Sequence, residues 1–288
     1  MADFTFAHRE EGFDQHIEQS IRGYSYLIDD VISLSRHFVE DNTKVYDIGC
    51  STGKMTQRLI EANFDHCTLA SWYGIEIADG FQKELQEREK AIRKFDPTAS
   101  VYFKQQDIRE IKIVNASLVT SIFTLQFMPK KDRQTVINGI WNGLNDGGAY
   151  IFAEKTICES ARHQDMLTFN YYDYKRKSFS TDDIMDKEIT LRPMMKPNTW
   201  LEIQDMLTTA GFKEVQPFWR NYMFVGVIAI NSYGDSMKRL LKTVHVEHFE
   251  EYEGEQRLIR VETTTEKYFP NDSAPAHRPT KSTKVEYI

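Results

Sequence analysis

Three acidic side chains, Asp47, Glu76 and Asp107, each lie at or just beyond the end of a short segment whose pattern predicts a β-strand. The carboxyl ends of parallel strands meet at one edge of an open α/β sheet, and ligands bind in the crevice at that edge. Carboxylates accept hydrogen bonds from amines and hydroxyls. We therefore expect the three acids to converge on one ligand that carries amine and hydroxyl groups.

The loop after the first predicted strand, Gly49-Cys-Ser-Thr-Gly53, adds a second feature to this crevice. Glycines let the backbone pass close to a ligand, and the N–H groups that begin the next helix attract an anion. Asp47 beside the loop attracts a cation and repels a pyrophosphate. This combination suits an aminoacyl zwitterion, so the sequence predicts S-adenosylmethionine (SAM). Asp47 then faces the amine, Glu76 the ribose hydroxyls and Asp107 the adenine amino group.

Three other interpretations of the loop compete with this one. Its letters satisfy G-x-S-x-G, with Ser51 as the nucleophile of a hydrolase elbow. An elbow belongs on a central strand, whereas only a helix and a short lead precede this loop. A dinucleotide site prefers G-x-G-x-x-G, and an ordinary strand-to-helix turn needs no ligand at all. The two later acids favour SAM over these alternatives.

The first 231 residues predict a SAM-binding α/β domain with a doubly wound, mostly parallel sheet. Strands and helices alternate along the chain, which is typical of that fold. A closely spaced pair of strands, 213–218 and 221–231, predicts an antiparallel last strand. The other expected elements are strands over 44–48, 71–77, 101–104, 117–123 and 149–153, and helices over 13–39, 53–63, 80–94, 131–144 and 197–209.

Two segments depart from this alternation. Residues 156–212 are too long for a simple crossover, and we expect a helical insertion that acts as a lid or a dimerisation element. We expect residues 232–288 to form a C-terminal extension that is partly disordered. Within it, 235–252 predict a helix, 256–268 a strand or hairpin, and 270–288 a disordered end with few apolar residues.

Composition excludes several classes of protein. A net charge of −7 argues against a protein that coats nucleic acid, and 41% hydrophobic residues predict a folded core. Three cysteines without a pairing spacing indicate a reducing compartment, so we expect a cytoplasmic protein. No secretory leader and no membrane span are expected. His245 and His248 lack a third ligand, so no metal site is expected.

Several short motifs within about 12–231 occur together in this chain. They are Arg22-Gly-Tyr-Ser25, Val45-Tyr-Asp-Ile-Gly-Cys-Ser51, Asp107-Ile-Arg-Glu-Ile111, Asn115-Ala-Ser117, Phe123-Thr-Leu-Gln-Phe127, Gly143-Leu-Asn-Asp-Gly-Gly148 and Glu154-Lys155. The set resembles class I SAM-dependent methyltransferases, and more closely the carboxy-S-adenosyl-L-methionine (carboxy-SAM) synthase family. The resemblance implies a Rossmann-like fold and a homodimer. It also implies a reaction that converts SAM and prephenate to carboxy-SAM, which is later used to modify the wobble uridine of tRNA.

Carried over residue by residue, the resemblance implies a set of cofactor contacts. These are Tyr24, Gly49, Cys50, Ser51, Glu76, Asp107 and Ile108. The crevice itself adds Asp47, Gly53, Ile77 and Phe123. Glu76 stands where the family has an aspartate, a change that keeps the chemistry toward ribose. No general base stands out, so no catalytic residue is assigned.

Two positions depart from the family pattern on the side where the reaction takes place. Ile122 stands where the family has an asparagine. Glu188 stands where the family has an arginine that grips the extra carboxylate of carboxy-SAM, although a shift of register brings Arg192 to that position. A glutamate repels a carboxylate that an arginine binds. We therefore favour a SAM-dependent methyltransferase, with carboxy-SAM synthesis as the alternative and a non-catalytic SAM-binding module as the second alternative.

Four further residues are candidates for the acceptor side or the lid. Tyr172 and Arg176 belong to an aromatic and basic stretch that could contact nucleic acid, but an amphipathic helix is the favoured interpretation. Tyr222 is expected in the sheet core, in a dimer interface or against the acceptor. Gln126 completes the set, from the run that begins at Phe123.

Overall fold

The computed structural model describes residues 13–232, 241–252, 255–267 and 280–287. The chain divides into two compact units, Met1–Ser232 and Tyr233–Ile288. Each unit is described by itself.

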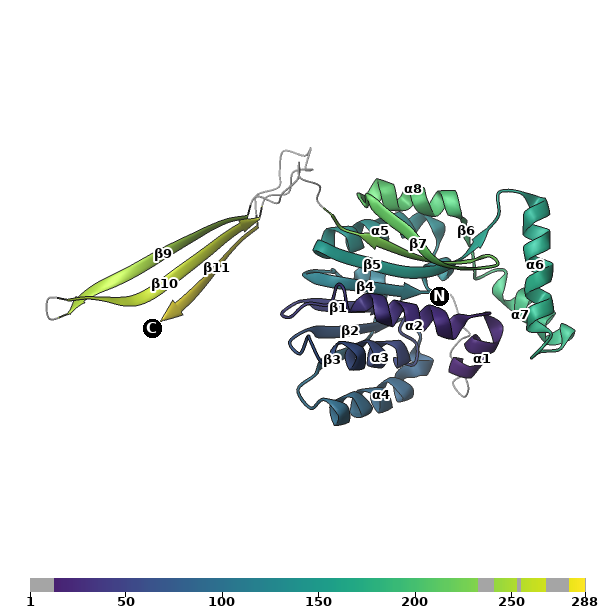
Figure 1. The fold of residues 1–288 in the computed structure, drawn as a ribbon, viewed down its shortest axis with the longest axis horizontal. Coiled ribbons are helices and arrows are strands. Elements are labelled where there is room, and N and C mark those ends of the chain that lie inside the picture. Colours follow the sequence, from purple (N-terminus) through teal and green to yellow (C-terminus); the bar gives the residue numbers. More distant parts are fainter. Residues whose placement is uncertain (1–12, 233–240, 253–254, 268–279, 288) are drawn as a thin grey trace. The chain divides into compact units, whose positions relative to one another are not determined.

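The first unit is built on a mixed sheet whose strand order is β3-β2-β1-β4-β5-β8-β7 (Figure 1). The first five strands are parallel to one another, and β8 is antiparallel to both β5 and β7. The predicted doubly wound, mostly parallel sheet with an antiparallel last strand is therefore confirmed. The strands are β1 Lys44–Ile48, β2 Ser71–Glu76, β3 Ser100–Gln105, β4 Ala116–Ile122, β5 Leu144–Ile157, β7 Glu214–Asn221 and β8 Phe224–Ile230, with the short β6 Asn198–Thr199 paired to β5.

Helices cover the sheet and extend beyond one end of its strands. The helix expected over 13–39 is instead two helices, because Gly23 adopts a left-handed backbone with φ 76° and begins the second of them. The helices are α1 Phe13–Ser20, α2 Tyr24–Ser35, α3 Lys54–Asn63, α4 Gln82–Phe95, α5 Lys130–Gly143, α6 Ala161–Lys175, α7 Thr181–Leu191 and α8 Trp200–Ala210.

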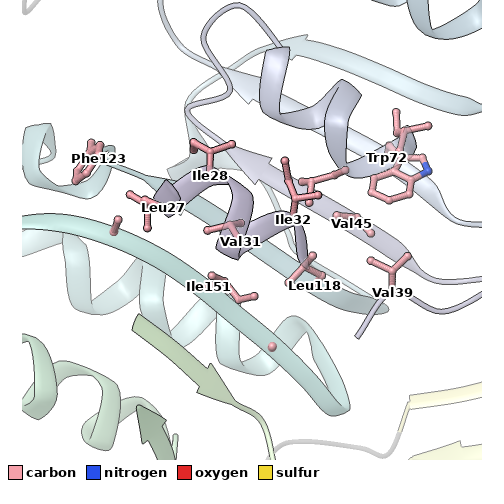
Figure 2. Packing of buried hydrophobic residues seen from close by; sticks show 14 of the residues in the cluster. Leu27, Ile28, Val31, Ile32, Val39, Val45, Trp72, Leu118, Phe123 and Ile151 are labelled. Atoms are coloured by element: carbon pink, nitrogen blue, oxygen red, sulfur yellow. The ribbon is translucent and has the colours of Figure 1, made fainter. Parts of the chain in front are cut away.

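The hydrophobic core lies on both faces of the sheet. On one face, α2 presents Leu27, Ile28, Val31 and Ile32 at the spacing of one helical stripe, and Figure 2 shows them over the central strands. On the other face, α5 and α8 bury apolar side chains against β4, β5 and β8. Strand β4 is buried along nearly its whole length, as expected for a parallel strand covered on both faces.

The segment 156–212 serves two different purposes. Helix α8 buries Ile203 and Leu207 in the second core cluster, so it covers the sheet. Helices α6 and α7 leave the layered part of the fold and lie with α1 beyond one end of the strands (Figure 1).

The second unit is a three-stranded antiparallel sheet with the order β11-β10-β9. Its strands are β9 Leu241–Tyr252, β10 Glu255–Lys267 and β11 Thr280–Tyr287. The strand expected over 256–268 is confirmed. The helix expected over 235–252 is wrong for 241–252, which is a strand and contains Thr243, Val244, Val246, Phe249 and Tyr252, residue types that favour strands.

The predicted disordered end is wrong for residues 280–287. The polar strand β11 pairs its backbone with β10, and this pairing does not depend on apolar side chains. Residues 235–240, 270–279 and 288 lie outside the described residues. In the described parts of the chain, every helix is too short or too polar to cross a bilayer.

Two glycines of α5 give a matched test of this packing. A Cβ at Gly143 would lie 2.4 Å from the carbonyl oxygen of Ile113, whereas a Cβ at Gly139 would meet nothing within 4 Å. We expect Gly143→Ala to lower the free energy of unfolding by about 1–3 kcal/mol through overpacking. Gly139→Ala should raise it by about 0.5–1 kcal/mol, because alanine favours a helix interior. Urea unfolding of both variants measures these changes, and equal effects would contradict the packing.

Candidate functional site

A cavity of about 310 Å³ lies at the carboxyl edge of the parallel strands. It is bounded by the loops that follow β1, β2, β3 and β4 and by residues of α1, α2, α6 and α7. The structure brings most of the predicted site residues to this cavity. Those that line it are Tyr24, Asp47, Gly49, Cys50, Ser51, Glu76, Ile77, Asp107, Ile108, Ile122, Phe123, Gln126 and Glu188.

The glycine loop after β1 forms the floor of the cavity. The N–H groups of Gly49 and Cys50 both donate to the carbonyl of Ile75, at 2.7 and 3.1 Å. Gly49 has φ 72°, and a Cβ there would lie 2.3 Å from the Thr124 hydroxyl oxygen. Only glycine therefore fits this close approach. Gly53, with φ 70°, begins α3 and does not itself line the cavity.

The carboxylate of Asp47 is buried at the end of β1. It accepts hydrogen bonds from the Thr56 hydroxyl of α3 at 2.6 Å and from the Thr120 hydroxyl of β4 at 3.0 Å. Burial raises the pKa of Asp47 to about 6, although the two hydroxyls favour its ionised form. A cation that binds beside this carboxylate would stabilise the charge.

Glu76 ends β2 and faces the same cavity. Its two carboxylate oxygens accept the backbone N–H groups of Ser51 and Ala78, each at 2.9 Å. Burial raises the pKa of Glu76, while these hydrogen bonds oppose the shift. Because each oxygen has a second lone pair, the carboxylate can also accept a pair of neighbouring hydroxyls.

Asp107 is held by a residue that the sequence argument did not include. The Arg109 guanidinium lies 2.5 Å from one oxygen of Asp107 and 2.8 Å from Asp132. Its hydrogen bond to Asp107 lowers the pKa of that carboxyl. Asp107 also accepts the Arg109 N–H and so caps a short 3-10 turn over Ile108–Glu110. A ligand amino group at Asp107 therefore shares the carboxylate with Arg109.

An aromatic wall runs from α2 across the end of β4 to α6. The ring of Phe123 lies 6.3 Å from Tyr24 and 5.5 Å from Phe224, and Phe224 lies 5.4 Å from Tyr171. Phe123 has φ 55°, an uncommon backbone for a bulky residue, at the point where β4 ends. Phe224 and Tyr171 were not among the predicted site residues.

Two lysines also reach the cavity without having been predicted. The ammonium groups of Lys155 on β5 and Lys175 on α6 lie 5.8 and 5.3 Å from the centre of the Tyr171 ring. Lys155 belongs to one of the motifs named above, and Lys175 lies in the aromatic and basic stretch. Helical spacing alone could not tell which lysine of that stretch turns inward.

The remaining predicted residues lie away from the cavity lining. Tyr222 accepts a hydrogen bond from Arg22 at 3.2 Å, and Arg176 pairs with Asp173 at 2.6 Å. Tyr172 and Arg192 are not part of the lining either. Between the two positions weighed for the family's arginine, Glu188 lines the cavity and Arg192 does not.

The geometry can now be compared with known proteins. A family model described as "Methyltransferase domain" matches residues 45–148. An O-methyltransferase family protein from Burkholderia thailandensis has a similar structure, with a TM-score of 0.55 and 14% identity, over 80% of this chain and 63% of that one. Magnesium protoporphyrin IX methyltransferase from Synechocystis is also similar, with a TM-score of 0.51 and 18% identity, over 75% of this chain and 87% of that one. The fold is therefore that of the SAM-dependent methyltransferases.

Sequence relatives narrow this class. The chain is 34% identical over 235 residues to the carboxy-S-adenosyl-L-methionine synthase of Shewanella baltica, which covers 80% of this chain and 93% of the relative. It is 32% identical over 222 residues to the synthase of Staphylococcus epidermidis, and this match covers 76% of this chain and 92% of the relative. The chain belongs to the carboxy-SAM synthase family. It is a SAM-dependent transferase with SAM as its cofactor.

The residues present fit this cofactor. Asp47 offers a carboxylate for the amine, Glu76 has lone pairs for the ribose hydroxyls, and the start of α3 offers N–H groups for the carboxylate. In the described residues, no group of three or more His, Cys, Asp or Glu side chains is arranged to hold a metal ion. Side chains of His245 and His248 lie outside this description.

The raised pKa of Asp47 predicts that SAM binding depends on pH. The cationic amine lowers this pKa on binding, so a proton is released and the affinity falls as pH drops below about 6. We expect SAM to bind about tenfold more weakly at pH 5 than at pH 7.5. Burial also raises the pKa of Glu76, so protonation of Glu76 adds to the loss of SAM affinity as the pH falls. Calorimetry at several pH values measures the effect.

Asp47→Asn should bind SAM weakly and lose most of this pH dependence. The exposed carboxylate of Asp65, which pairs with Arg36 outside the cavity, provides the control variant Asp65→Asn. An unchanged slope in Asp47→Asn would show that another group carries the proton.

Proposed function

We propose that this enzyme transfers the methyl group of SAM to a small acceptor. The observation that carries the proposal is Glu188, an anionic side chain on the cavity lining at the position that the family resemblance assigns to an arginine. A carboxylate there favours the positive sulfonium of SAM and disfavours the extra carboxylate of carboxy-SAM. Ile122, in place of the family's asparagine, removes a polar group from the same side.

SAM supplies an electrophilic methyl group. A nucleophilic atom of the acceptor forms the new bond to this carbon, the electrons of the carbon–sulfur bond return to sulfur, and the acceptor proton passes to solvent. The protein binds and orients the two molecules, which is the main requirement of such a displacement. Asp47 and Glu76 hold the cofactor, and the aromatic wall keeps water from the reacting side.

Carboxy-SAM synthesis is the second candidate function. It is supported by the relatives named carboxy-SAM synthase, which match 80% and 76% of this chain. In this case the product would serve modification of the wobble uridine of tRNA. A non-catalytic SAM-binding module is the third candidate, and turnover of SAM with any acceptor would eliminate it.

The nucleoside that copurifies with the protein separates the two reactions. Mass spectrometry of the released ligand should find SAM or S-adenosylhomocysteine. A species heavier than SAM by one carboxyl group would overturn methyl transfer in favour of carboxy-SAM synthesis.

Glu188→Arg should reverse the charge preference of the site. An arginine binds a carboxylate through two parallel hydrogen bonds, so we expect the ratio of SAM affinity to carboxy-SAM affinity to fall by about tenfold or more. Calorimetry with both nucleosides measures the ratio. Arg192→Gln is the control, because Arg192 lies off the cavity lining. If Glu188→Arg leaves the ratio unchanged, Glu188 does not face the sulfonium side.

We infer that the chain forms a homodimer through α6 and α7, which also form the lid of the proposed SAM-binding domain. This inference is supported by large apolar side chains that are exposed on the two helices: Met166, Phe169, Met185 and Ile189. Contiguous exposed apolar surface marks interfaces. Phe169 and Ile189 are each 64% exposed, the highest values among these four side chains.

Ile189→Asp should convert the dimer to a monomer in analytical ultracentrifugation, because it places a charge in the apolar interface. Leu69→Asp is the matched control, since Leu69 is 61% exposed on the connection before β2. Equal sedimentation of wild type and Ile189→Asp would exclude this interface.

We also propose a cytoplasmic location and no direct nucleic-acid contact. The described cysteines are all unpaired, which suits a reducing compartment. Arg176 of the aromatic and basic stretch is paired with Asp173, which leaves less positive charge for phosphates. Cell fractionation and a filter-binding assay with tRNA test these two statements.

A further inference from the structure

Lys155 and Lys175 approach the cavity from two different elements, β5 and the end of α6. Both ammonium groups lie within 6 Å of the centre of the same ring, that of Tyr171. Two like charges are therefore gathered at one place. Such an arrangement stabilises the protein only when an anion lies between or beside them.

Lys175 is nearly inaccessible to solvent, with 4% of its surface exposed. Within the described chain its ammonium group has the Tyr171 ring as its neighbour and forms neither a hydrogen bond nor an ion pair within 4 Å. Burial lowers the pKa of Lys175, and Lys155 lowers it further, while Glu188 opposes both. A buried cation without a carboxylate in direct contact is costly, so this position suits a ligand that supplies one.

The charged groups that act on Tyr171 and Lys175 favour a particular ligand charge. Lys155 and Lys175 contribute two positive charges, and Glu188 contributes one negative charge. With S-adenosylhomocysteine bound, whose sulfur is neutral, one further negative charge balances these three groups, which is the charge of a carboxylate. A phosphate monoester with nearly two charges would leave the site with an excess of negative charge.

The position in the sheet assigns this site to the acceptor. Glu76 and Asp107, at the ends of β2 and β3, face the adenosine part of the proposed SAM pose, and Asp47 on β1 faces its amine. The strand order then continues through β4 to β5, which carries Lys155. The two lysines thus lie on the far side of the cofactor site from the adenosine.

We infer that Lys155 and Lys175 anchor the carboxylate of the methyl acceptor, which is a small monocarboxylic acid with an apolar body. The body packs on the aromatic wall, where Tyr171 meets Phe224 edge to face at 5.4 Å. The anchored carboxylate is a handle and not the methylated atom. The identification of this ligand as the methyl acceptor rests on the proposed methyl transfer. The anion site itself does not depend on that proposal.

A titration with simple probes tests the site. The protein is saturated with S-adenosylhomocysteine, and phenylacetate is added in a calorimeter, in parallel with its neutral analogue phenylacetamide and with phenyl phosphate. We expect phenylacetate to bind, phenylacetamide to bind at least tenfold more weakly, and phenyl phosphate to bind no better than phenylacetate. Lys155→Gln and Lys175→Gln should each weaken phenylacetate binding by about tenfold or more, because each removes one charged partner.

Lys177→Gln is the matched control. Its ammonium also lies over a tyrosine ring, that of Tyr174 at 5.8 Å, but Lys177 is exposed and does not line the cavity. The Lys177→Gln variant should bind phenylacetate with the affinity of the wild-type protein. Unchanged affinity for S-adenosylhomocysteine verifies that each variant is folded.

Three results would overturn the inference: equal binding of phenylacetate and phenylacetamide, unchanged binding in both cavity variants, or tighter binding of phenyl phosphate. The nucleoside mass spectrum is independent of this titration. If carboxy-SAM copurifies while phenylacetate binds through the two lysines, methyl transfer is wrong and the anion site remains. If SAM copurifies and phenylacetate does not bind, methyl transfer remains and the anion site is wrong.

Discussion

The buried carboxylate of Asp47 is the constraint around which the site is arranged. It joins three elements, because it lies on β1 and accepts hydrogen bonds from Thr56 on α3 and Thr120 on β4. These two hydroxyls replace part of the hydration that the carboxylate loses on burial. The hydroxyls do not neutralise the charge of the carboxylate, so burial still destabilises its ionised form and raises the pKa of Asp47. A cationic ligand removes that cost, so the fold itself prepares a place for an amine.

Charge is divided across the cavity in a way that follows the order of the strands. The ends of β1 and β2 present carboxylates, whereas β5 and α6 present ammonium groups beside Tyr171. Glu188 from α7 enters on the cationic side and reduces its charge by one. The site is therefore asymmetric: it offers carboxylates to the cationic cofactor on one side and ammonium groups to the proposed anionic partner on the other. This asymmetry gives each molecule one preferred orientation.

Much of the first unit could be predicted because its signals are local. The buried strands read as short apolar runs, the acids follow them directly, and the glycine loop needs a left-handed backbone that few other residues adopt. The break at Gly23 and the placement of α8 in the core were missed. Both depend on what the helices pack against, and a helical period alone does not contain that information.

The second unit shows the opposite case. Its strand β11 has a polar sequence that predicts disorder when it is considered alone, yet its backbone pairs with β10 over eight residues. Strand pairing joins segments that are distant along the chain, and composition says little about it. The same reason explains why 241–252 was expected to be a helix.

The sequence by itself determined the part of the cavity that binds the cofactor. Asp47, Glu76 and Asp107 lie at the ends of strands, and the parallel order of these strands brings the three acids together. Only the tertiary structure decided which residues line the opposite side of the cavity, where α6 and α7 lie. Whether Lys175 turns toward the cavity or toward solvent, and whether Glu188 or Arg192 reaches it, depends on how α6 and α7 pack over the edge of the sheet. Neighbouring residues of one helix differ in direction by about 100°, so a small rotation of the helix changes which side chain meets the ligand.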